Sequence, residues 1–110
     1  MMNIIGNIKN KTCVIIDDIV DSAGTLCNAA KSIEKNGAKA VYAYITHGVF
    51  SGKAISKISK SPLKSLVITD SIELTQGTRT SNTIRSLSVA KLLGEAIKRI
   101  SLEKSVSVLF

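Results

Sequence analysis

The protein has 110 residues, a length that allows one domain with a single hydrophobic core. Its hydrophobic content of 45% excludes a disordered chain, and its formal net charge of +7 draws attention to anionic ligands. The longest apolar run, "AVYAYI" at 40–45, is far shorter than the roughly 20 residues that a membrane span needs. The N-terminus has no apolar core followed by a small-residue cleavage site. We therefore expect a cytoplasmic protein with no membrane partner.

The first half of the chain predicts a strand, a helix and a second strand. Residues 14–16 are a continuous apolar run, which favours a strand buried on both faces, as in a parallel sheet. A second strand follows at about 40–45. The helix between them should end at "NG", 36–37, because Asn and Gly tolerate the left-handed conformation of a C-cap. Its buried stripe is formed by Leu26, Ala29, Ala30 and Ile33.

The next stretch predicts a short helix and two further strands. Ser51 is placed to cap a helix that carries Ile55 and Ile58 and ends before Pro62. "SLVIT" at 65–69 is typical of a third strand, and "IRSL" at 84–87 of a short fourth one. The polar segment between them, "ELTQGTRTSNT", has no apolar period and is interpreted as a loop.

The C-terminal region predicts one more helix, capped by Ser88, in which Glu95 can pair with Lys98 or Arg99. The tail "KSVSVLF" alternates polar and apolar residues, which favours a strand or an extended docking segment. The apolar stripe of the helix comprises Val89, Leu92, Leu93, Ala96, Ile97 and Ile100.

The alternation of strands and helices predicts an α/β fold, with an open, mainly parallel sheet and flanking helices in one domain over residues 1–110. Three or four strands make a small sheet, and continuous apolar strands require cover on both faces. Part of that cover is therefore expected to be missing from this chain.

The two cysteines and the basic residues are not interpreted as functional sites. Cys13 and Cys27 lack CxxC spacing, so free buried thiols are favoured over a disulfide or a metal site. There is no basic run and there are only four aromatic residues, so no nucleic-acid partner is expected. The lysines at helical spacing are interpreted as a solvated face rather than a nucleic-acid stripe: Lys53, Lys57, Lys60 and Lys64.

The acidic cluster in "IIDDIVDSAGTL", 15–26, carries the main functional signal. It lies at the carboxyl end of a predicted strand, where open α/β sheets bind ligands. The small residues allow close approach, and backbone N–H groups with the hydroxyls of Ser22 and Thr25 suit a phosphate. Asp17 and Asp18 suit sugar hydroxyls, directly or through Mg²⁺ and its waters. A sugar phosphate fits both the turn that suits a phosphate and the aspartates that suit sugar hydroxyls. The plainer alternative is that Asp21 caps the helix and the other two carboxylates are solvated.

The segment "VIIDDIVDSAGT" resembles the phosphoribosyl-diphosphate loop of the type I phosphoribosyltransferase fold. "THGVFSGKA", "VITDSI" and "LSVAKLLGEAIKRI" with the terminal "SVSVLF" are similar to the C-terminal region of ribose-phosphate diphosphokinases, and occur in that family's order. These kinases of nucleotide biosynthesis make phosphoribosyl diphosphate from ATP and ribose 5-phosphate. The resemblance thus implies a truncated phosphoribosyltransferase-like domain.

The resemblance also implies roles for individual residues. Ser105 and Ser107 would lie near a regulatory phosphate or nucleotide site between subunits of a homo-oligomer. His47 is interpreted as structural. Mg²⁺ is the implied cofactor, with no direct ligand in this chain. Ribose 5-phosphate or phosphoribosyl diphosphate would be bound by Asp17, Asp18, Asp21, Ser22, Ala23, Gly24 and Thr25.

Most ATP contacts and the catalytic Lys and Arg of that family lie in segments that these 110 residues do not contain. Phosphoryl transfer depends on such cations, so we expect no catalytic residue here. The favoured hypothesis is a C-terminal piece, from a split or degraded gene, that keeps the sugar-phosphate loop but is inactive alone. One alternative is a non-catalytic partner of a full-length enzyme or of an N-terminal half chain. Another is a small autonomous phosphoribosyltransferase, although its pyrophosphate loop and base-binding hood are not seen.

Overall fold

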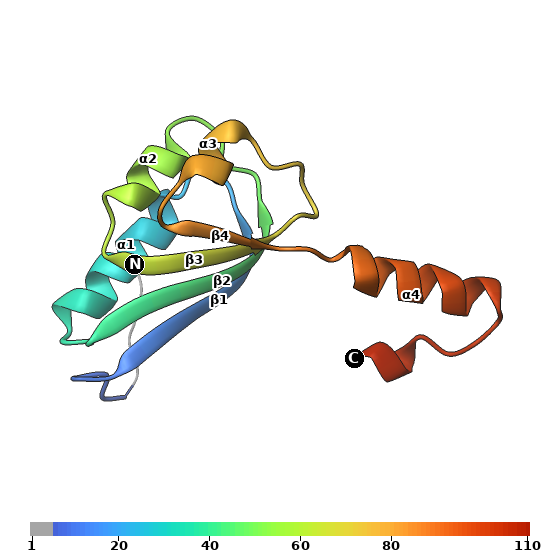
Figure 1. Ribbon diagram of the computed structural model, residues 1–110. Helices are drawn as coiled ribbons and strands as arrows, with labels where there is room; N and C mark the ends of the chain where they lie inside the picture. Colours follow the sequence, from blue (N-terminus) through green and yellow to red (C-terminus); the bar gives the residue numbers. More distant parts are fainter. Residues whose placement is uncertain (1–5) are drawn as a thin grey trace.

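The computed structural model describes residues 6–110, which form a four-stranded sheet with helices against one face (Figure 1). All strand pairs are parallel, and the strand order β1-β2-β3-β4 follows the sequence. The predicted open parallel α/β fold is therefore confirmed. The elements in chain order are β1 (Thr12–Val20), α1 (Gly24–Lys35), β2 (Ala40–Gly48), α2 (Ala54–Ser59), β3 (Leu63–Thr69), α3 (Gln76–Thr80), β4 (Ile84–Leu87), α4 (Ala90–Ser101) and a 3₁₀ turn, η1 (Ser107–Leu109).

The hydrophobic core lies between the sheet and the layer formed by α1, α2 and α3 (Figure 1). Helix α1 buries Leu26, Cys27 and Ala30 in it, close to the predicted stripe. As expected, α1 ends at "NG", with Asn36 as C-cap and Gly37 at a φ of 97°. The fully buried side chains of the other elements include Val41, Ala43, Ala54, Ile58, Leu66 and Ile68.

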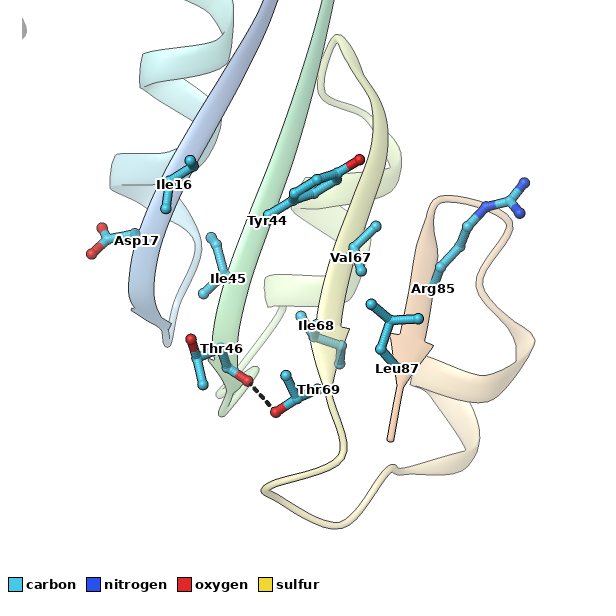
Figure 2. A pocket seen from close by; sticks show the side chains of 10 residues that line it. All are labelled: Ile16, Asp17, Tyr44, Ile45, Thr46, Val67, Ile68, Thr69, Arg85 and Leu87. Atoms are coloured by element: carbon cyan, nitrogen blue, oxygen red, sulfur yellow. Dashed lines mark hydrogen bonds between the residues drawn. The ribbon is translucent and has the colours of Figure 1, made fainter. Parts of the chain in front are cut away.

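The opposite face of the sheet is not covered by any element among residues 6–110. The expectation that 14–16 are buried on both faces is wrong for that face, because the side chain of Ile16 is 79% exposed and that of Tyr44 is 53% exposed. Figure 2 shows this face, with the side chains of Ile16, Tyr44 and Val67 on three neighbouring strands. Parallel sheets are normally buried on both faces, so this arrangement is unusual for a complete domain.

Several local predictions differ from the structure. The segment interpreted as a loop contains the five-residue helix α3, in which the Thr75 side chain caps the N–H of Thr78 at 3.2 Å. Helix α2 starts after Lys53 and has no side-chain cap, so Ser51 is not its N-cap. The C-terminal tail forms η1 rather than a strand.

Helix α4 projects away from the sheet, and none of its residues is buried (Figure 1). The N-cap of α4 is Val89 and not the predicted Ser88, although the Oγ of Ser88 accepts the N–H of Ala90 at 3.1 Å. The expected support by Glu95 is confirmed as an ion pair with Arg99 at 3.1 Å. No helix within residues 6–110 combines the length and the apolar character needed to cross a bilayer.

Candidate functional site

Strand β1 continues through both adjacent aspartates to Val20, so Asp17 and Asp18 lie in the strand and not beyond its end. Asp17 pairs with Ile45 of β2 in the sheet register. The backbone N–H of Asp18 donates to Asp17 Oδ1 at 2.8 Å. Side chains alternate along a strand, so these two neighbouring carboxylates are directed to different faces.

The turn after β1 brings the chain into α1 without a capping side chain. Ala23 is the N-cap, with a φ of 70° in the left-handed region, and makes no side-chain hydrogen bond to the helix. The plainer interpretation of Asp21 as the helix cap is therefore wrong. Because no side chain caps this end of α1, the N–H groups of its first turn are left for another acceptor. An anion is the acceptor that the helix dipole favours there.

The turn is held in place by the segment that follows β2. The N–H of Val49 donates to the carbonyl of Val20 at 2.9 Å, and the N–H of Ser51 donates to the carbonyl of Asp21 at 3.1 Å. Ala23 itself is buried, and its carbonyl accepts the N–H of Cys27 at 2.9 Å. Hydrogen bonds from the segment 49–51 and from α1 therefore hold Ala23 in its left-handed conformation. A non-glycine residue adopts this conformation only at a cost of about 1–2 kcal/mol.

A hollow of about 330 Å³ lies beside this turn, within the size range of small-ligand sites. Five of the seven residues expected to bind ribose 5-phosphate line it: Asp17, Asp21, Ser22, Ala23 and Thr25. Asp18 is not among the lining residues, and Gly24 faces a separate hollow bordered by lysines of α1 and α2. The sequence reasoning missed the apolar part of the wall, which includes Ile15, Ile19 and Ala29.

Among residues 6–110, no cationic side chain lies within ion-pairing distance of the carboxylates of the hollow. Arg99 and Glu95 form the one ion pair among residues 6–110, so Asp17 and Asp21 are unpaired in that part of the chain. Both are exposed, and their oxygens can accept hydrogen bonds from hydroxyl groups. Within the same residues, no group of three or more His, Cys, Asp or Glu side chains is arranged to hold a metal ion. The side chains present therefore do not fit a direct Mg²⁺ site.

The remaining candidates lie outside this hollow. Ser105 and Ser107 are exposed on the tail, with their Oγ atoms 2.7 Å apart. The imidazole Nδ1 of His47 has a partner, as a structural role requires, in Ser71 Oγ at 2.7 Å. Both cysteines are free, as expected, but only Cys27 is buried, whereas Cys13 in the edge strand β1 is partly exposed. Burial raises the pKa of the Cys27 thiol, and a hydrogen bond with Ser61 offsets this in part.

A larger hollow, of about 550 Å³, lies on the uncovered face of the sheet (Figure 2). Its walls are mostly apolar and come from all four strands. Arg85 and Leu87 of β4 lie at one side of it and Asp17 of β1 at the other. No signal in the sequence distinguished this hollow from an ordinary buried sheet face.

Comparison with known proteins gives a consistent result along the whole chain. The family model described as "Phosphoribosyl synthetase-associated domain" matches residues 1–110. The chain is 58% identical over 110 residues to ribose-phosphate pyrophosphokinase of Rhizobium meliloti, and 59% identical to that of Mesorhizobium japonicum. All of this chain is covered in both comparisons, but only 36% and 35% of the relatives. The chain thus spans about a third of the length of these relatives.

Among solved structures, the phosphoribosylpyrophosphate synthetase of Mycobacterium smegmatis matches with a TM-score of 0.86 and 30% sequence identity. The match covers 90% of this chain and 33% of the other one. The sheet and helices described above are therefore similar in arrangement to one third of a longer folded chain.

Proposed function

Because the chain belongs to the phosphoribosyl synthetase-associated domain family, we propose that its 110 residues act as the ribose 5-phosphate-binding part of a ribose-phosphate pyrophosphokinase. The observation that carries the proposal is the uncapped start of α1 beside two unpaired carboxylates, around one hollow of about 330 Å³. Phosphoribosyl diphosphate, which carries the same 5-phosphate and ribose, fits the same groups.

Each part of the hollow has a distinct role in this proposal. The N–H groups at the start of α1, with the hydroxyls of Ser22 and Thr25, donate to the 5-phosphate. The carboxylates of Asp17 and Asp21 accept from the ribose hydroxyls. Asp18, which lies in β1, and Gly24, the first residue of α1, are outside the lining of the hollow, so in this proposal they contribute only through the backbone conformation. Mg²⁺, which the family resemblance implies, would bring its charge to the sugar phosphate with ligands from outside this set of residues.

These 110 residues form a partial domain that binds substrate and does not catalyse phosphoryl transfer alone. The reaction needs groups that neutralise developing charge, and the hollow is lined by carboxylates, hydroxyls and apolar side chains without a Lys or Arg. In the same proposal, Ser105 and Ser107 contribute to a regulatory phosphate site that a neighbouring subunit completes. A cytoplasmic location is also part of the proposal, on the basis of the family.

Isothermal titration calorimetry with ribose 5-phosphate, with and without Mg²⁺, tests the binding role. Thr25→Ala removes one charge-assisted hydrogen bond of roughly 1.5–3 kcal/mol, so we expect about 10- to 100-fold weaker binding. Asp21→Ala should weaken binding as well, whereas Glu34→Ala, an exposed acid at the far end of α1, should not. Equal heats for the three variants and the unchanged chain, or no heat from folded protein, would refute the proposal.

A second candidate function is that of a non-catalytic partner subunit. The uncovered apolar face of the sheet favours it, because a parallel sheet of this kind is normally completed by a further layer. This candidate is compatible with the binding role, and the two differ in what they require. Sugar-phosphate binding needs the turn at 21–25, and partner binding needs the opposite face of the sheet.

A further inference from the structure

We propose that the chain docks onto a separate polypeptide that carries the upstream two thirds of a ribose-phosphate pyrophosphokinase, through two bare apolar surfaces. This inference rests on the family assignment and gives the partner-subunit candidate a defined interface. The sheet surface consists of Ile16, Tyr44, Val67, Arg85 and Leu87. The helix surface consists of Leu92, Leu93, Ile97 and Ile100 of α4.

The sheet surface is a row of side chains fixed by the strand register. Ile16 pairs with Tyr44, Tyr44 with Val67, and Val67 with Arg85 across the four strands. The row borders the hollow of about 550 Å³ (Figure 2). The three helices that could cover a sheet all lie on the other face (Figure 1). A chain that binds here would bury an apolar layer and complete the second face of the sheet.

The helix surface lies on α4, which makes no buried contact with the rest of residues 6–110. Its large apolar side chains are at helical spacing, and Ile97 remains 68% exposed. A helix of 12 residues is marginally stable in water without tertiary packing. The tail folds back after α4, and Arg99 donates to the carbonyl of Ser105 at 3.2 Å. The apolar stripe therefore needs a partner of its own.

The length of the relatives indicates which partner supplies both contacts. In the Mycobacterium smegmatis structure, a similar fold is one third of a chain, so two thirds of that chain lie outside it. The Rhizobium meliloti relative likewise has about two thirds of its length outside the match. A partner must reach the sheet surface and the projecting α4, on a body that extends 51 Å in its longest direction. A polypeptide of that size can span both surfaces.

Charge argues against a second copy of this chain as the occupant. Each copy carries a net charge of +7 and has Arg85 in this row, so two copies that paired through the sheet surface would bring like charges together. Arg85, at the β4 side of the row, has no carboxylate partner within residues 6–110. The occupant should therefore present an apolar helix or strand to Tyr44 and an acidic side chain near Arg85.

Co-expression tests the interface. The 110-residue chain is produced together with the upstream two thirds of the Rhizobium meliloti enzyme and analysed by size-exclusion chromatography with light scattering. We expect one complex that contains both polypeptides. Tyr44→Asp on the sheet surface and Ile97→Asp on the helix surface should each weaken it at least about tenfold, since each buries a charge in an apolar contact. Lys31→Asp, on the exposed side of α1, is the matched control and should not change it.

Circular dichroism of each variant shows whether its fold is intact, and both substituted surface positions are exposed in the chain. Three outcomes overturn the proposal: no complex, a complex that survives both substitutions in folded variants, or a homodimer of the chain alone that Tyr44→Asp dissociates. Ribose 5-phosphate titration of the same chain without partner is independent of these results. A failed interface therefore leaves the binding function to its own test, and failure of binding leaves the interface standing.

Discussion

The two faces of the sheet are built from the same strands and have opposite environments. On one face, α1, α2 and α3 bury alternate side chains such as Ile45 and Leu66. On the other, their neighbours Tyr44 and Val67 border an open hollow. The side chains on the first face are packed as in a complete domain. The second face carries apolar side chains but has no covering layer within residues 6–110. The difference indicates that the chain's stability comes from one face, while the other is available for association.

The largest expected effect is the difference in free energy of unfolding between a substitution in the covered face and one in α4. Ile58 is fully buried between α2 and the sheet, so Ile58→Ala should lower the free energy of unfolding by about 2–5 kcal/mol. Ile97→Ala deletes similar atoms from an exposed stripe and should change it by less than about 0.5 kcal/mol. Urea denaturation monitored by circular dichroism gives both values. Similar losses for the two variants would mean that α4 packs against the body in solution.

Thiol reactivity is a second way to compare the packed layer with the open sheet edge. Cys27 is buried in α1, and desolvation raises the pKa of its thiol, so little thiolate forms at neutral pH. Cys13 lies in the edge strand β1 and is only half-buried. We expect an aromatic disulfide reagent to modify Cys13 at least about tenfold faster.

The single-thiol variants Cys13→Ala and Cys27→Ala assign the two rates. The raised pKa of Cys27 also has a consequence for stability. The stability associated with the protonated Cys27 thiol is fully present below the pKa that this thiol has in the unfolded chain. That stability is lost as the pH rises from there through the higher pKa of the folded state. Equal reaction rates for both thiols would show that α1 opens readily, contrary to the comparison.

The smallest expected effect concerns the link between β3 and α4. Asp70 Oδ1 accepts the N–H of Val89 at 2.8 Å, and this hydrogen bond, with a further one from Ser88, holds the pKa of Asp70 below its usual value. A carboxyl with a lowered pKa contributes stability above its unfolded pKa, and that contribution is lost as the pH falls through the folded-state pKa. Asp70→Asn should therefore lower the melting temperature slightly at neutral pH, and the difference should vanish in acid. A difference that grows in acid would contradict this role.

Much of the covered face could be predicted from sequence, because periodicity reports burial directly. "IRSL" is β4 as predicted, and "NG" ends α1 where the left-handed position is needed. Helix α3 was missed because its five residues carry no apolar stripe. The end of β1 was placed too early because its last residues are held by pairing with β2, which local sequence does not reveal. For the uncovered face, an apolar run predicts burial but does not identify the covering polypeptide.

At the candidate site, the loop at 21–25 also shows that local sequence does not reveal what depends on tertiary contacts. Its residue types predicted a turn into a helix that suits a phosphate, and the uncapped α1 agrees with that geometry. Which side chains share one hollow depends on strand alternation and on the position of α1. That is why Asp17 lines the hollow and Asp18 does not. The apolar wall also depends on segments that are distant in the sequence, since Ala29 of α1 and Ile45 of β2 line the same hollow.

Hydrogen–deuterium exchange of the chain, alone and with the upstream two thirds of the Rhizobium meliloti enzyme, tests the contrast between the faces most directly. Alone, amides of β2 and β3 should be protected, and those of α4 should exchange nearly as in a free peptide. With the partner, α4 and the segment around Tyr44 should gain protection, while α1 and α2 change little. Strong protection of α4 in the chain alone, or protection gained only on the face that the helices already cover, would contradict the account.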